Sequence, residues 1–133
     1  CWNGELDALK LTFARDLLCQ ADVNNHNHDY WVNKIQTGKR VYITINENDK
    51  ILAWSDANFQ KDRLGRTAKN LIAKNAIYLD FTDGKNVKNI HQVWYEVNEN
   101  QIVDQFFEAV FTGMRGENTE GLIFDNNKNV YKL

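Results

Sequence analysis

The sequence predicts an α/β protein built on a mostly parallel sheet with covering helices. Strand-like and helix-like segments alternate along the chain. The two clearest strands, 41–45 and 76–81, are apolar almost throughout, as expected for strands buried on both faces. Polar residues that can carry chemistry follow these strands, and in a parallel sheet such residues gather at the carboxyl ends of the strands.

The composition is that of one soluble globular domain. The chain has 133 residues, of which 43% are apolar and 26% charged. Its 4 Trp, 5 Tyr and 7 Phe can build a core, which argues against disorder. A net charge of −2 argues against a basic nucleic-acid-binding face, and no apolar run reaches the roughly 18–20 residues of a membrane span. We therefore expect no nucleic-acid partner, no membrane span and no cofactor.

The first half of the chain predicts two strands and two helices. Residues 17–21 form a short apolar run typical of a buried strand, and turn-prone residues from Asp22 onward end it. Residues 29–36 space their apolar side chains like one face of a helix. The β-branched and aromatic segment 41–45 is the clearest strand of the chain, and 51–59 follows it as a helix.

The second half continues the alternation. Residues 67–73 predict another turn or two of helix, and 76–81 a second clear strand. A longer helix follows, with Asn98 as its N-cap and Gly113 at its end. Its buried stripe is predicted to be Ile102, Val103, Phe106, Phe107, Val110 and Phe111. The last twenty residues predict a small hairpin or an extended tail.

Several absences are informative. Ser55 is the one serine, so a serine nucleophile within these residues could be no other. Cys1 and Cys19 are too few for a disulfide framework and slightly favour the cytoplasm, although the compartment stays open. The chain starts at Cys1 and has no methionine before Met114, which leads us to expect a fragment of a longer protein.

An acid and a histidine follow successive strands. Asp49 comes shortly after strand 41–45, and His91 follows strand 76–81 after a polar loop. This order is that of the last two members of a Ser…Asp…His triad in an α/β-hydrolase. In such a triad the histidine takes and returns a proton, while the carboxylate holds its tautomer and stabilises the imidazolium.

Three stretches resemble the C-terminal part of a bacterial branch of the α/β-hydrolase superfamily, whose members are mostly functionally uncharacterised serine hydrolases. These stretches are 18–25 (LCQADVNN), 41–55 (VYITINENDKILAWS) with Arg63-Leu64-Gly65 after it, and 78–95 (YLDFTDGKNVKNIHQVWY). The resemblance covers about residues 15–113 and leaves 114–133 as a tail. We accordingly interpret residues 1–133 as a single domain or a fragment.

The resemblance implies a role for each strand and for the residues after it. Residues 17–22, 41–45 and 76–81 would be the sixth, seventh and eighth strands of the hydrolase fold. Asp49 would be the triad acid and His91 the triad base. Asp22 is a competing acid, because some lipase-like members carry the carboxylate after the sixth strand.

The chain departs from the family in lacking the nucleophile. It contains no G-x-S-x-G elbow and no oxyanion-hole loop, both of which precede the acid in this fold. Ser55 lies after Asp49 on a predicted helix, not on an elbow. The expected function is therefore the C-terminal portion of an esterase- or lipase-like serine hydrolase, acting on a small ester-type substrate and inactive alone.

A second interpretation is a non-catalytic binding or interaction domain. The edge of strand 17–22 would be exposed where the fifth strand of the fold would pair, and such an edge invites pairing between copies. Under this interpretation we expect a dimer or a higher homo-oligomer.

The candidate acids and base also have structural interpretations. Asp49 could be a turn acid or a helix N-cap, and Asp22 a capping residue at a strand end. His91 could be an ordinary, partly buried histidine.

Other side chains suggest weaker hypotheses. His26 and His28, together with His91, could form a metal site, although two histidines in an Asn-rich loop are common by chance. Trp54 and Trp94 could line a substrate pocket, but we expect them to be core residues.

Overall fold

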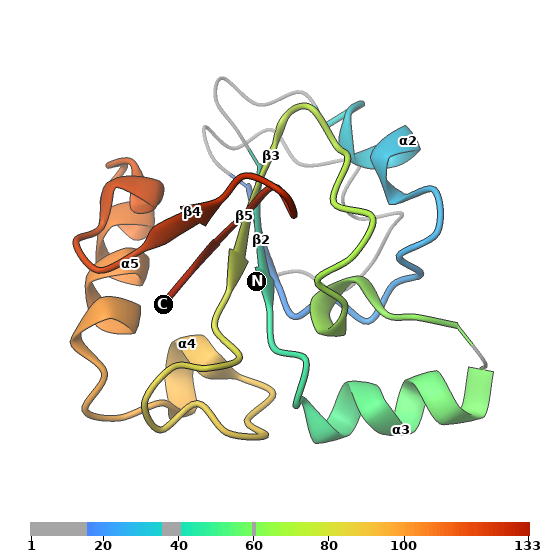
Figure 1. Cartoon of the computed structure of the whole chain (residues 1–133), viewed down its shortest axis with the longest axis horizontal. Helices are drawn as coiled ribbons and strands as arrows, with labels where there is room; N and C mark the ends of the chain where they lie inside the picture. Colours follow the sequence, from blue (N-terminus) through green and yellow to red (C-terminus); the bar gives the residue numbers. More distant parts are fainter. Residues whose placement is uncertain (1–15, 36–40, 60) are drawn as a thin grey trace.

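A computed structural model describes residues 16–35, 41–59 and 61–133 of the chain (Figure 1). Its elements are β1 (Asp16–Cys19), α2 (His28–Val32), β2 (Val41–Ile45), α3 (Lys50–Phe59), the 3-10 turn η1 (Leu64–Arg66), β3 (Ala76–Asp80), α4 (Val93–Glu96), α5 (Gln101–Phe111), the 3-10 turn η2 (Gly116–Asn118), β4 (Ile123–Asp125) and β5 (Val130–Lys132).

The strands form one five-stranded, mostly parallel sheet in the order β1-β2-β3-β5-β4. β1, β2, β3 and β5 run parallel, and only β4 is antiparallel to its neighbour. The predicted α/β class with a mostly parallel sheet is therefore confirmed. In Figure 1 both α3 and α4 lie at the end of the sheet where β2 and β3 finish.

Alternate residues of the strands supply two cores on opposite faces of the sheet. One core joins strand residues such as Ile43 and Tyr78 to Trp31 and Val32 of α2. The other joins Tyr42, Ile77 and Leu79 to the buried face of α5, which is Val103, Phe106, Phe107 and Val110. The two helices therefore cover opposite faces, as Figure 1 shows.

The strands and the helix nearest the candidate site fold as predicted. β2 has the predicted bounds, and α3 and β3 differ from the predictions by a single residue. β1 is shorter than predicted because it ends at Cys19. The next residue, Gln20, has a φ of 40°, a left-handed conformation that interrupts the strand.

The helix predicted over 67–73 is wrong. This segment has no regular secondary structure, and the short turn η1 lies before it. Asn70 has a φ of 56°, which a helix cannot contain. The apolar spacing instead reflects burial of Leu71 and Ala73 against the sheet.

The ends of α5 differ in part from the prediction. Its N-cap is Asn100 and not Asn98, because the backbone N–H of Val103 donates to Asn100 Oδ1 at 3.1 Å. Phe111 lies on the last turn and is 62% exposed, so its predicted burial is wrong. Gly113 follows the helix with a φ of 87°, as expected of a glycine at a helix end.

The last residues form a hairpin that completes the sheet. β4 and β5 pair in antiparallel fashion, as one of the two predicted alternatives has it. β5 also pairs in parallel with β3, with Leu79 opposite Tyr131. This second pairing was not predicted, because three-residue strands carry no periodicity that names a distant partner.

None of the helices in the described part of the chain has the length and apolar character needed to cross a bilayer.

Candidate active site

Asp49 lies where β2 has ended and α3 begins. Its Oδ1 accepts hydrogen bonds from the backbone N–H groups of Ile51, at 2.9 Å, and Leu52, at 3.0 Å. Asp49 is thus the N-cap of α3, and this contact fixes the orientation of its carboxylate. The residue is fully buried, with 0% of its surface exposed, yet its second oxygen is left available for another partner.

His91 supplies that partner. Its Nδ1 lies 2.6 Å from Asp49 Oδ2, so one carboxylate caps the helix with one oxygen and binds the histidine with the other. The hydrogen bond with Asp49 raises the pKa of His91 above its ordinary value, and the charges of Asp22 and Glu96 raise it further, whereas partial burial lowers it. The side chain of His91 is 22% exposed.

His91 uses only one ring nitrogen, Nδ1, in hydrogen bonds with the described residues. Among the described residues, none forms a hydrogen bond with Nε2. Because a carboxylate can only accept, the neutral ring carries its proton on Nδ1 and leaves Nε2 as an acceptor. This is the tautomer that a general base needs.

Gln20 is a site residue that the sequence did not indicate. Its Nε2 donates to Asp49 Oδ2 at 3.2 Å and to the carbonyl of Ile90 at 2.9 Å, while its Oε1 accepts from the backbone N–H of Val93 at 3.2 Å. The one available signal was a polar side chain inside the apolar run 17–21.

Asn46 holds the same segment from the end of β2. Its Nδ2 donates to the carbonyls of Lys88, at 3.0 Å, and Ile90, at 2.8 Å. Its Oδ1 accepts from the backbone N–H of Asn48 at 3.1 Å, which shapes the turn that leads to Asp49. Both backbone segments that carry the pair are therefore anchored by buried amides.

The competing acid, Asp22, has other partners. Its Oδ1 accepts a hydrogen bond from Ser55 Oγ at 2.8 Å and lies 3.1 Å from Arg63 Nε. Of the two candidate acids, both within the described residues, only Asp49 is hydrogen-bonded to His91. Asp22 acts on His91 through its charge alone.

The three histidines do not converge on a metal site. His28 is fully buried, with Nδ1 at 2.7 Å from the carbonyl of Asn25 and Nε2 at 2.6 Å from Tyr78 Oη. His26 is exposed, and within 16–35, 41–59 and 61–133 no group of three His, Cys, Asp or Glu side chains is placed to hold a metal ion.

Cys19 is disulfide-bonded. Its sulfur is therefore neither a nucleophile nor a metal ligand. The cysteines also give no support to the cytoplasmic preference drawn from their number.

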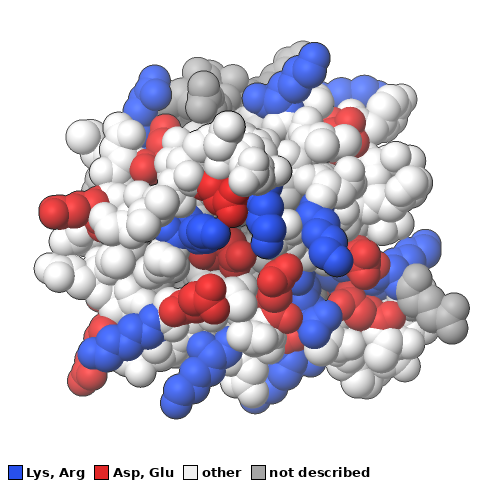
Figure 2. Space-filling model, in the orientation of Figure 1, with Lys and Arg blue, Asp and Glu red and all other residues white. Residues whose placement is uncertain are grey.

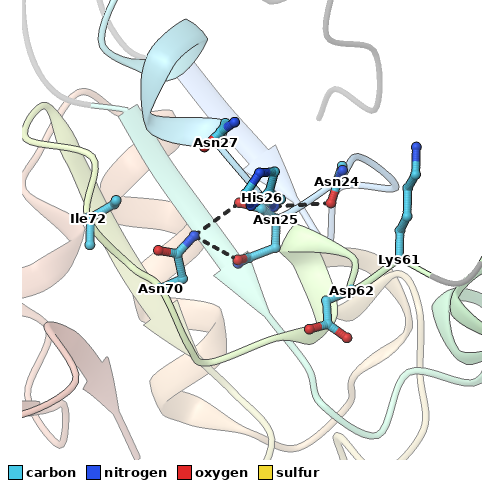
Figure 3. A pocket seen from close by; sticks show the side chains of 8 residues that line it. All are labelled: Asn24, Asn25, His26, Asn27, Lys61, Asp62, Asn70 and Ile72. Carbon is cyan, nitrogen blue, oxygen red and sulfur yellow. Dashed lines mark hydrogen bonds between the residues drawn. The ribbon is translucent and has the colours of Figure 1, made fainter.

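A polar pocket of about 560 Å³ lies apart from the pair. Figure 3 shows its lining from residues 24–27 and from Lys61, Asp62, Asn70 and Ile72. Its amides largely bind one another or the backbone. Asn70 Nδ2 donates to Asn25 Oδ1 at 3.1 Å, and Asn24 Oδ1 accepts from the backbone of His26.

The two tryptophans near the pair are not core residues, so that expectation is wrong. Trp54 is 65% exposed and Trp94 is 42% exposed. Trp94 packs against Tyr95, with ring centroids 5.6 Å apart, on the short helix that follows His91. The rings lie on the surface because α3 buries Leu52 and Ser55 and α4 buries Val93, which are on other faces of these helices.

Comparison of the chain with protein-family models, with curated proteins and with solved structures finds no match. The resemblance to α/β-hydrolases therefore stays a prediction.

Proposed function

We propose that this chain supplies the acid, Asp49, and the base, His91, of a serine-hydrolase-type active site whose nucleophile lies outside residues 1–133. The observation that carries the proposal is the 2.6 Å contact between His91 Nδ1 and Asp49 Oδ2. This contact joins the segments that follow two adjacent parallel strands, β2 and β3. The pair would be the C-terminal contribution to an esterase- or lipase-like protein and inactive alone.

The arrangement suits acyl transfer. Nε2 of His91 would take the proton of a serine hydroxyl as its oxygen attacks an ester carbonyl, and would return it to the departing alcohol. A water molecule activated in the same way would then release the acid and regenerate the serine. Asp49 would stabilise the imidazolium formed in each half-reaction, which agrees with the direction of the His91 pKa shift.

A small ester-type substrate fits the surface better than a polyanion does. On the face shown in Figure 2, acidic and basic side chains alternate, so no large field of one sign is present there to attract nucleic acid. The exposed rings of Trp94 and Tyr95 lie on α4, the short helix that begins two residues after His91, and could contact an apolar acyl group.

The experiment uses the gene product that contains this chain. Hydrolysis of p-nitrophenyl butyrate is measured for the wild type and for His91→Gln and Asp49→Asn. We expect kcat/KM to fall by about 10³- to 10⁴-fold in both variants, because each removes a member of one acid–base unit. His26→Gln replaces an exposed histidine and serves as the matched control, with activity expected to stay within about twofold of wild type.

A further variant separates the two candidate acids. Asp22→Asn keeps an acceptor for Ser55 Oγ, and it removes the ion pair with Arg63 and a charge that acts on His91 without a hydrogen bond. We expect an activity loss of less than about tenfold. Wild-type-like hydrolysis by His91→Gln would refute the proposal, and a larger loss in Asp22→Asn than in Asp49→Asn would reassign the acid.

A self-associating binding domain is the second proposal. The observation that favours it is the outer strand β4, where Ile123 is 65% exposed and Phe124 45% exposed. Among the described strands β4 pairs only with β5, and β1 pairs only with β2. A second copy could add to such an edge without any catalytic chemistry.

A further inference from the structure

We infer that Gln20 is a positioning residue for the Asp49–His91 pair, because its buried amide ties the acid to the segment that carries the base. This inference rests on the function proposed above and adds a residue that acts through the pair, not on the substrate.

The contacts of Gln20 bracket His91 along the chain. The amide donates to the carbonyl of Ile90, the residue before His91, and accepts from the N–H of Val93, two residues after it. Its remaining hydrogen reaches Asp49 Oδ2, the same oxygen that binds His91 Nδ1. Both amide hydrogens and the amide oxygen are thus used, in a side chain that is only 1% exposed.

The backbone of Gln20 is held from outside the pair. Its N–H donates to Thr44 O at 3.1 Å and lies 3.2 Å from Thr44 Oγ1. The backbone of η1 packs directly against it, since a Cβ at Gly65 would clash with the carbonyl carbon of Gln20. The backbone of Gln20 is therefore held in place, so its amide can restrain both Asp49 and the segment that carries His91.

The conformation of Gln20 supports a role beyond folding. A φ of 40° is unfavourable for a residue with a side chain, and such residues cluster where function depends on geometry. A buried amide at this position also has to satisfy all its hydrogen bonds, which an apolar residue in the run 17–21 would not require. Both features are explained together if the amide sets the distance between Asp49 and His91.

A purely structural role of the Gln20 amide and a positioning role predict different results. If Gln20 only satisfies buried polar groups, its loss lowers the free energy of unfolding and leaves the Asp49–His91 hydrogen bond as it was. If Gln20 positions the pair, its loss loosens the segment around His91 and weakens that bond. The imidazole Nδ1 proton of His91 reports this bond directly.

The test is made on the full chain with Gln20→Met, which has a similar length and no amide. Proton–nitrogen NMR of the imidazole rings follows the solvent exchange of the His91 Nδ1 proton and the pKa of His91. We expect exchange to be about tenfold faster or more, because the bond opens more often. The pKa of His91 should fall toward its ordinary value, since the bond to Asp49 is the main cause of its elevation.

Asn100→Leu is the matched control. Asn100 is likewise a buried amide, 4% exposed, that donates to Lys85 O and accepts from Val103 N, but it contacts neither member of the pair. We expect it to lower stability and leave both His91 readouts unchanged. If Gln20→Met does not fold, Gln20→Asn carries the test, because it keeps the amide but is one methylene too short to span the same contacts.

The outcomes separate this inference from the proposed function. Unchanged exchange and pKa of His91 in a folded Gln20 variant overturn the inference. When the Gln20 substitution is made in the gene product that contains this chain, we expect kcat for ester hydrolysis to fall with KM nearly unchanged. If the wild type hydrolyses no ester but the His91 signals respond as expected, the proposed function fails and the positioning of the pair stands.

Discussion

At the scale of single residues, the chain uses two histidines in opposite ways. The pKa of His91 is raised by a carboxylate, whereas burial lowers the pKa of His28. His28 donates from Nδ1 to the carbonyl of Asn25, so its Nε2 accepts from Tyr78 Oη. Tyr78 Oη in turn accepts from the backbone N–H of Ala73. A second proton on His28 would leave no acceptor for the Tyr78 hydroxyl.

This network predicts acid sensitivity. The folded-state pKa of His28 lies below the unfolded value of about 6.5, so the unfolded chain binds more protons at mildly acid pH. The contribution of neutral His28 is fully present above that value and is lost as the pH falls from it toward the folded-state pKa. Urea unfolding from pH 8 to pH 5 should show this loss, and His28→Gln should flatten it.

The control for this experiment is His26→Gln, which replaces an exposed histidine. His91 acts with the opposite sign. Its raised pKa stabilises the fold at low pH, and this contribution disappears as the pH rises through the folded-state value. An equal slope in wild type and His28→Gln would contradict the assignment of acid sensitivity to His28.

The residues of the candidate site were unevenly predictable. Asp49 and His91 could be singled out because each follows a recognisable strand in a known chain order, and the structure brings them together. The choice between Asp49 and Asp22 as the partner of His91 required the three-dimensional structure, since both acids follow strands. Gln20 and Asn46 were missed because an amide partnered with distant backbone groups leaves no local pattern.

At the scale of elements, the turn η1 and the end of β1 constrain one another. Gly65 N–H donates to Ala21 O at 3.0 Å, and Asn46 N–H donates to Gly65 O at 2.9 Å. Gly65 therefore stands between the ends of β1 and β2. A side chain there would strike the backbone of Gln20 and Ala21, which cannot move aside as a flexible side chain can.

We predict that Gly65→Ala lowers the free energy of unfolding by about 3 kcal/mol or more, measured by urea unfolding. The same substitution should speed the solvent exchange of the His91 Nδ1 proton, because it displaces Gln20. Gly84→Ala is the comparison, since its closest contact is the movable Val87 side chain, at 2.7 Å. A cost for Gly65→Ala no greater than that for Gly84→Ala would argue against this account.

Elements were predictable where local pattern and tertiary burial agree. The continuous apolar strands β2 and β3 and the intervening α3 are of this kind. The segment 67–73 and the last turn of α5 are not. In the first case the left-handed conformation of Asn70 breaks the helix that the apolar spacing suggests. In the second case Phe111 continues the apolar stripe of α5, but it lies beyond the part of the helix that packs against the sheet.

At the scale of the whole molecule, the outer strand β4 bears on self-association. We predict that light scattering of the chain at high concentration shows a dimer or a larger oligomer, formed through the exposed Ile123 and Phe124. Ile123→Lys should shift the population to monomer, because a charged edge disfavours strand addition. Phe111→Lys, an equally exposed position on α5, is the control and should not. A wild-type monomer at high concentration would count against this proposal.

The parallel sheet has a consequence for how the molecule folds. Gln20 contacts Asp49, which is 29 residues away in sequence, and Val93, which is 73 residues away. Asp49 and His91 are separated by 42 residues. Such contacts form only after long loops have closed, which makes folding slow and leaves the pair unassembled in any intermediate that lacks β1, β2 or β3. The Nδ1 proton of His91 would therefore report when β1, β2 and β3 have come together, and its appearance in a refolding experiment would time that step.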